Sequence, residues 1–244
     1  MLKTLILSAA AAGVAAGLFT AVVQHVTTTP IIIEAEKYEG GGAPHDHGAS
    51  APAHEHGDAA QPVSAEPTAM EAAEEEWAPA DGIERTLYTS LATTVIGVGF
   101  ALVLLAAMNF SGVRIGPRSG LAFGIAGFIA ISLAPALGLP PEIPGSGAAE
   151  LTARQAWWFF AAAATVIGIA GLLLTRSVAL QIGGVVLIAL PHLVGAPHPD
   201  AYVSTAPAEL AGHFAAASLA VTAIFWAVLG YTSGAFYERF SRSG

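Results

Sequence analysis

The sequence predicts an all-α polytopic membrane protein, a helix bundle of about six transmembrane helices. Apolar residues make up 54% of the 244 residues and charged residues only 11%, whereas a soluble domain carries about 25% charged residues. The mean hydropathy is +0.62. The apolar residues also fall into separate runs of about the length that crosses roughly 30 Å of hydrocarbon as a helix.

The first apolar run extends from residue 4 to about residue 26, and we expect it to form the first span within a segment of residues 1–33. Its only ionisable group is His25, at its far end. A cleaved signal peptide is the alternative, but the apolar part is longer than a usual signal core. We therefore expect an uncleaved helix. Gly13 and Gly17 form a GxxxG pattern, which is typical of a helix-packing face.

Residues 34–85 predict an outer, acidic loop without stable structure. They contain 13 acidic groups against Lys37 and Arg85 alone, and such a stretch buries too little apolar surface to fold by itself. A crude repeat places two His-x-His pairs beside carboxylates, a composition that binds metals weakly and adaptably. We interpret this repeat as a metal-capture segment, and the alternative is a solvated linker. Its histidines are His45, His47, His54 and His56.

The remaining apolar runs predict five further spans, which form one unit over residues 86–244. A basic loop separates the second span from the third, and a tight turn separates the fourth from the fifth. Pro135 lies near the end of the third span, and Pro191 interrupts the fifth one late. The runs cover residues 86–110, 119–139, 156–174, 178–194 and 208–237.

The distribution of charge predicts the topology. Six spans place both termini on one side, and the loops and ends on that side carry six Lys or Arg residues against three on the other. By the positive-inside rule we expect the termini in the cytoplasm. Seventeen of the 18 acidic residues then fall on the outer side, where they attract cations.

The segment between the fifth and sixth spans, residues 191–213, contains most of the polar candidates. Imidazole and carboxylate are the donors that a borderline divalent cation prefers. Glu209 and His213 are four residues apart and share one helical face. An ionisable group inside a span, such as His213, is costly and usually faces a cavity or a partner. The candidate ligands are His192, His198, Asp200, Glu209 and His213, with His25 on the same side of the membrane.

Each of these candidates has an alternative, structural interpretation. A kink at Pro191 frees a backbone carbonyl, and His192 next to it is placed to cap that carbonyl. His198 stands between two prolines as a loop residue would. Glu209 and His213 can form a buried hydrogen bond with each other. The residue types alone leave both interpretations open.

Further polar residues are expected at the same level, among them Glu142, Arg154 and Gln155. Together with the outer segments they predict a vestibule that narrows towards the membrane. Arg154 lies near Trp157 in sequence, so we interpret it as an anchor at the membrane interface. The sequence has no cysteine, no Walker motif and no H-E-x-x-H motif. We therefore expect no thiolate site, no ATPase and no zinc hydrolase.

Several local strings resemble the CbtA family of cobalt transporter subunits, and the resemblance covers essentially the whole chain. The layout of six spans with a His-bearing first outer loop is similar as well. The strings read LPPE at 139–142, RQAWW at 154–158, PHLVGAP at 191–197, PAEL at 207–210 and FW at 225–226.

The resemblance implies a multi-pass protein of the bacterial inner (plasma) membrane that transports Co²⁺ for cobalamin supply. It also implies a partner, the small single-span, His-containing subunit CbtB. The donor set itself suits Ni²⁺ and Zn²⁺ equally well, so cobalt enters through the resemblance alone. We expect the lipid bilayer as surroundings, no organic cofactor, no nucleic-acid partner and no enzymatic activity. The alternative is a non-transporting scaffold or metal-buffering subunit of a larger complex.

Overall fold

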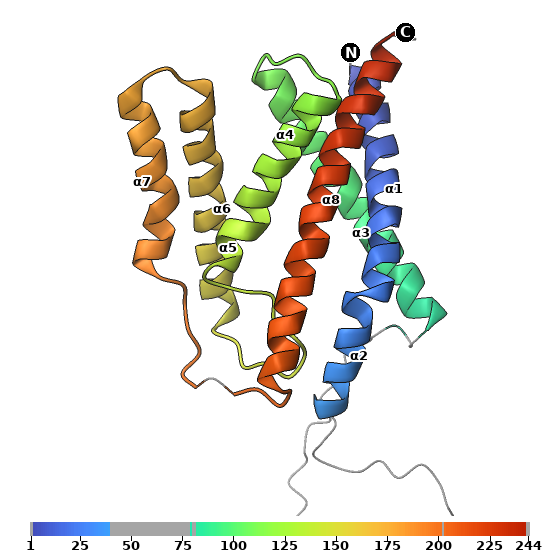
Figure 1. The fold of residues 1–244 in the computed structure, drawn as a ribbon, viewed down its shortest axis with the longest axis vertical. Coiled ribbons are helices and arrows are strands. Elements are labelled where there is room, and N and C mark those ends of the chain that lie inside the picture. The colour runs from blue at the N-terminus through green and yellow to red at the C-terminus, as the bar shows by residue number, and fades with distance from the viewer. Residues whose placement is uncertain (1, 40–78, 80–81, 202, 243–244) are drawn as a thin grey trace, which may run out of the picture.

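Six helical passes run side by side in the computed structural model, which describes residues 2–39, 79, 82–201 and 203–242. Both termini lie at one end of the bundle (Figure 1), called here the terminal end. The C-terminal ends of α2, α5 and α7 lie at the other end, called the opposite end. The described residues form helices and no named strand. This arrangement confirms the predicted all-α polytopic fold class.

The first pass is α1 (Leu2–Val26), and a second helix, α2 (Thr28–Glu39), follows it after one residue. Residues 34–39 and 83–85, which the sequence assigned to the outer loop, are helical. Ala35 explains the difference at 34–39, since it is fully buried against Ile143 and Ala206 of two other loops. Tertiary packing thus holds a segment that its own composition would not fold. The predicted capture histidines at 45–56 lie outside the described residues.

The second pass, α3 (Ile83–Phe110), returns along α1. The two helices approach closely at the predicted GxxxG face. A Cβ atom on Gly13 would overlap the backbone of Val98, and one on Gly17 would overlap the backbone of Thr94. The packing role of these two glycines is therefore confirmed.

The third pass is built from three consecutive pieces, α4 (Pro117–Gly127), the π-helical η1 (Phe128–Leu133) and the short α5 (Ala134–Ala136). At the end of η1, the Ala134 N–H donates to the carbonyl of Ile129, five residues back. Pro135 follows directly and has no N–H to continue the α-helical pattern. The wider turn is the local response to that missing donor.

The last three passes are α6 (Leu151–Leu174), α7 (Val178–Val194) and α8 (Ala208–Arg242). Five of the passes are long and apolar enough to cross a membrane, whereas α7 has only 17 residues. Within the described part of the chain, α7 packs against α6 and no other helix. Pro191 lies inside α7, which continues to Val194 as the sequence predicted.

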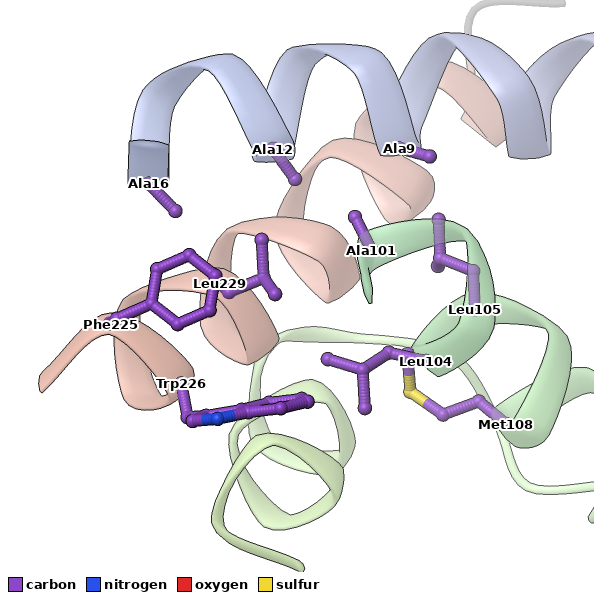
Figure 2. Packing of buried hydrophobic residues seen from close by; sticks show 10 residues of the cluster. All are labelled: Ala9, Ala12, Ala16, Ala101, Leu104, Leu105, Met108, Phe225, Trp226 and Leu229. Atoms are coloured by element: carbon purple, nitrogen blue, oxygen red, sulfur yellow. The ribbon is translucent and has the colours of Figure 1, made fainter. Parts of the chain in front are cut away.

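The main core lies between α1, α3 and α8 (Figure 2). Ala9, Ala12 and Ala16 form a smooth face on α1, which allows the larger side chains of its neighbours to approach. Leu105 and Leu229 are fully buried there. The first helix is thus packed into the bundle along its length.

At the opposite end, the α5–α6 loop and the α7–α8 loop are hydrogen-bonded to each other. Gly147 donates its N–H to the Val203 carbonyl at 2.7 Å, and Ser146 forms an antiparallel bridge with Ser204. The contacts of Ala35 add α2 to the same assembly. The predicted convergence of the outer segments is confirmed for their described parts.

Candidate functional site

A groove opens at the opposite end between the third pass, α6 and α8, with a volume of about 650 Å³. Within the described residues, α6 and α8 do not pack directly against each other. The groove occupies the space between them. Trp158 and Phe159 of α6 line one wall, Leu219 and Thr222 of α8 line another, and Ser132 of η1 contributes from the third pass.

The mouth of the groove carries an ion pair. Arg154 donates from Nη2 to Glu142 Oε2 at 2.7 Å, and the two side chains are 29% and 32% exposed. The Nε atom of Arg154 is buried and has no hydrogen-bond partner in the described structure. Gln155 lines the groove beside this pair. The mouth is therefore polar, and its two opposite charges compensate each other.

Sequence reasoning treated Arg154 as an interfacial anchor and missed its pairing with Glu142. Twelve residues separate the two, across a proline-rich loop whose path the sequence does not reveal. The one sequence feature that could have indicated this ion pair is that two opposite charges stand near the two ends of the same loop. The predicted co-location of Glu142, Arg154 and Gln155 is confirmed, because all three line the groove.

Glu150 determines where α6 begins, and thus where Arg154 and Gln155 lie. Its carboxylate accepts hydrogen bonds from the N–H groups of Thr152 at 2.8 Å and Ala153 at 2.7 Å. These hydrogen bonds favour the charged form and lower the pKa of Glu150. The cap is therefore fully formed at neutral pH and is lost only as the pH falls through that lowered pKa.

The groove extends along α8 to about the middle of that helix. Thr222 is 14 residues from the start of α8, or about 21 Å along the helix at 1.5 Å per residue. Trp226, one turn further, donates from Nε1 to Ser132 Oγ at 3.1 Å. This bond holds α8 against the π-helical segment, a type of turn that occurs frequently at functional sites.

His192 occupies the last turn of α7, away from the groove lining. Its ring meets the Trp157 ring edge-on, with centroids 6.0 Å apart. Trp157 donates from Nε1 to the carbonyl of Pro191 at 3.3 Å. The His192 Nε2 atom is buried without a hydrogen-bond partner in the described structure. The carbonyl of Pro191 thus accepts hydrogen bonds from Trp157 and from the Gly195 N–H, the latter at 3.0 Å, and not from His192.

Glu209 and His213 lie in the first turns of α8, and both are exposed. His213 precedes Thr222 by nine residues, or about two and a half turns at 3.6 residues per turn. It therefore lies on the face of α8 opposite to the groove. The expected vestibule thus contains the predicted polar residues of the α5–α6 loop and of α6, but not this pair.

The other predicted ligands lie apart from one another. His25 ends α1, and His198 and Asp200 lie in the α7–α8 loop, all three exposed. Among the described residues, no three His, Asp or Glu side chains are close enough together to hold a metal ion. His45, His47, His54 and His56 lie outside those residues, so their metal-capture role stays a prediction.

The basic residues of the opposite end are paired with carboxylates. Lys37 donates to Glu34 at 2.6 Å, and Arg85 donates to Glu36 at 2.8 Å. Glu34 raises the pKa of Lys37 through this hydrogen bond. Arg154 is paired with Glu142 at the groove mouth, so all three basic residues that the topology assigns to this end form an ion pair with a carboxylate. The surplus carboxylates of the same end therefore determine the sign of its field.

The comparisons with known proteins agree with the membrane fold and indicate a family of transporter subunits. The sequence model of a family described as "probable cobalt transporter subunit (CbtA)" matches residues 2–238. No curated protein and no solved structure matches the chain.

Proposed function

The chain belongs to the CbtA family of probable cobalt transporter subunits, and on that premise we propose that it is the membrane-spanning subunit for uptake of Co²⁺ into a bacterial cell. The observation that carries this proposal is the family match over nearly the whole chain. The groove supports it, because it runs from the opposite end along α6 and α8 to about the middle of α8. The uptake would serve cobalamin supply.

We place the opposite end outside the inner membrane and the terminal end in the cytoplasm. The six Lys and Arg residues of the terminal end support this orientation through the positive-inside rule. The acidic surplus then faces the medium from which the metal comes. A dication entering along a membrane potential of about 100 mV gains about 4.6 kcal/mol, since each charge is worth about 2.3 kcal/mol.

The groove supplies oxygen donors along its length. At the mouth, an arriving dication competes with the Arg154 guanidinium for the Glu142 carboxylate. Beyond it, Gln155, Ser132 and Thr222 offer neutral oxygen atoms, which replace part of the ion's hydration shell without trapping it by charge. We propose this groove as the entry route.

The histidines are proposed as donors that collect the ion before it enters the groove. His192 and His213 stand on different helices at the opposite end, and His25, His198, Asp200 and Glu209 lie in the same region. The described residues hold no complete ligand set, so we propose that the His-rich segment at 45–56 and a further subunit supply additional donors. A small single-span, His-containing partner of the CbtB type fits that requirement. The donor chemistry leaves Ni²⁺ and Zn²⁺ as competing ions.

Expression of this protein together with its partner is expected to raise cobalt accumulation several-fold in a cobalt-starved host. The measurement is uptake of radiolabelled Co²⁺, with Ni²⁺ and Zn²⁺ in parallel, in cells with and without the partner. Cells that carry the partner alone are the control. Accumulation equal to that of the empty vector would remove the transport proposal.

His192→Ala and His213→Ala are each expected to reduce cobalt uptake at limiting Co²⁺ by about tenfold, since even the outer-shell partners of metal ligands are worth about 10–100-fold in affinity. Leu193→Ala is the matched control, because Leu193 is 81% exposed beside His192. Protein levels in the membrane are compared by immunoblot. Normal uptake in both histidine variants would return these residues to the structural interpretation.

A second candidate function is a scaffold or metal-buffering subunit that does not itself transport. One observation favours it: the hollow at the terminal end is lined by three arginines and a single carboxylate, Glu238, which is a poor exit for a cation. Purified protein in proteoliposomes separates the two functions. Binding of Co²⁺ without accumulation in the lumen would support the scaffold.

A further inference from the structure

A second hollow, of about 790 Å³, lies at the terminal end, far from the groove. It opens between the loop that connects α3 with α4, the start of α4 and the last turns of α8. The residues that matter for its chemistry are Arg114, Arg118, Tyr231, Tyr237, Glu238 and Arg242. Segments more than 100 positions apart in the sequence thus build one polar pocket.

The hollow carries an uncompensated positive charge. Arg242 pairs with Glu238 four residues earlier on α8. Within the described part of the chain, the side chains of Arg114 and Arg118 make no hydrogen bond or ion pair, and both are exposed. The N-terminus of α4 adds a partial positive charge at the same place. An anion is therefore the ligand that this pocket favours.

The shape of the hollow selects among anions. Its lining extends along α8 from Arg242 back to Tyr231, eleven residues or about 16 Å at 1.5 Å per residue. The arginines lie at the end of the bundle, and Tyr231, which is 52% exposed, lies deeper along the membrane-spanning helix. A charged end followed by an aromatic and apolar wall matches the outline of a lipid better than that of a free ion.

We propose that this hollow binds an anionic phospholipid, with its phosphate held by Arg114 and Arg118 and its acyl chain lying beside Tyr231. Guanidinium groups match phosphate in a bidentate way, and basic pockets between helices on the cytoplasmic side are suited to lipid headgroups. The general positive-inside effect also places arginines at this end. It does not require them to converge on one pocket, and Arg176, in the α6–α7 turn of the same end, stands outside it.

The test is a lipid titration of the purified full-length chain in detergent, read by native mass spectrometry. Phosphatidylglycerol is expected to bind as a discrete adduct, and phosphatidylcholine is not. Arg114→Gln and Arg118→Gln are each expected to weaken phosphatidylglycerol binding about fivefold, the effect of one basic residue near an anionic surface. Arg176→Gln is the matched control and is expected to leave binding unchanged.

Other outcomes overturn the proposal. If Arg176→Gln weakens binding as much as Arg118→Gln does, the lipid follows general surface charge rather than this hollow. If millimolar inorganic phosphate displaces phosphatidylglycerol from the wild type, the pocket is a site for free phosphate. Arg118→Lys keeps the charge but loses the bidentate fork, so it is expected to bind more tightly than Arg118→Gln and less tightly than the wild type. If both Arg118→Lys and Arg118→Gln lose phosphatidylglycerol binding and both unfold at a lower temperature than the wild type, Arg118 acts in folding rather than in lipid binding.

Discussion

Leu219→Trp is expected to lower cobalt uptake on the order of tenfold while leaving the bundle folded, because pore dimensions control permeation. Leu219 lines the groove on the α8 side, opposite Trp158 and Phe159 of α6. A larger ring at this position extends into open space rather than into a packed wall. It therefore narrows the proposed entry route without forcing the helices apart. Initial rates of radiolabelled Co²⁺ uptake at matched protein levels measure the effect.

Ile224→Trp is the control for this experiment. Ile224 lies on the same helix, is 43% exposed and does not line the groove, so its replacement adds the same bulk on the outside. Leu219→Ala is expected to transport normally, because it widens the groove. Full uptake by Leu219→Trp would show that the ion takes another path. The scaffold function would then account better for the chain.

Gly230→Leu is expected to cost the folded protein at least about 3 kcal/mol, the upper end of the usual range for overpacking. A Cβ atom on Gly230 would overlap the carbonyl oxygen of Gly120 and come within 2.8 Å of the Gly124 Cα. Both neighbours are backbone atoms, which cannot rotate away as a side chain does. The helices α4 and α8 must therefore separate. Thermal unfolding in detergent and the amount of protein in the membrane report the loss.

Gly99→Leu is the matched control for helix propensity and added bulk. Gly99 lies in the middle of α3, and a Cβ atom there meets nothing within 4 Å. Its replacement is expected to leave the unfolding temperature unchanged or slightly higher, because leucine favours helix more than glycine does. Equal stability of the two variants would contradict the close packing of α4 on α8.

The passes of the bundle were predictable because each apolar run carries its own signal. The run at 178–194 became α7 with the same bounds, and the GxxxG pattern of the first run became its contact with α3. α2 was not predictable in this way. Its stability depends on the burial of Ala35 against two loops that lie far away in the sequence.

The candidate site was predictable in its composition but not in its grouping. The sequence indicated polar residues at one end of the bundle, and the structure gathers Glu142, Arg154 and Gln155 there. It also indicated a pair formed by Glu209 and His213. Their spacing correctly predicted one shared helical face, but a spacing within one helix says nothing about the direction in which that face points.

The sequence by itself determined that this chain crosses a membrane several times with both ends on one side. Hydrocarbon allows an apolar run few structures other than a helix, so length and composition suffice. Only the tertiary structure decided which polar residues meet. The rotation of α8 places Thr222 in the groove and His213 on its opposite face. The path of the α5–α6 loop brings Glu142 to Arg154. Rotation and loop path result from the packing of whole helices against one another, which no single stretch of residues encodes.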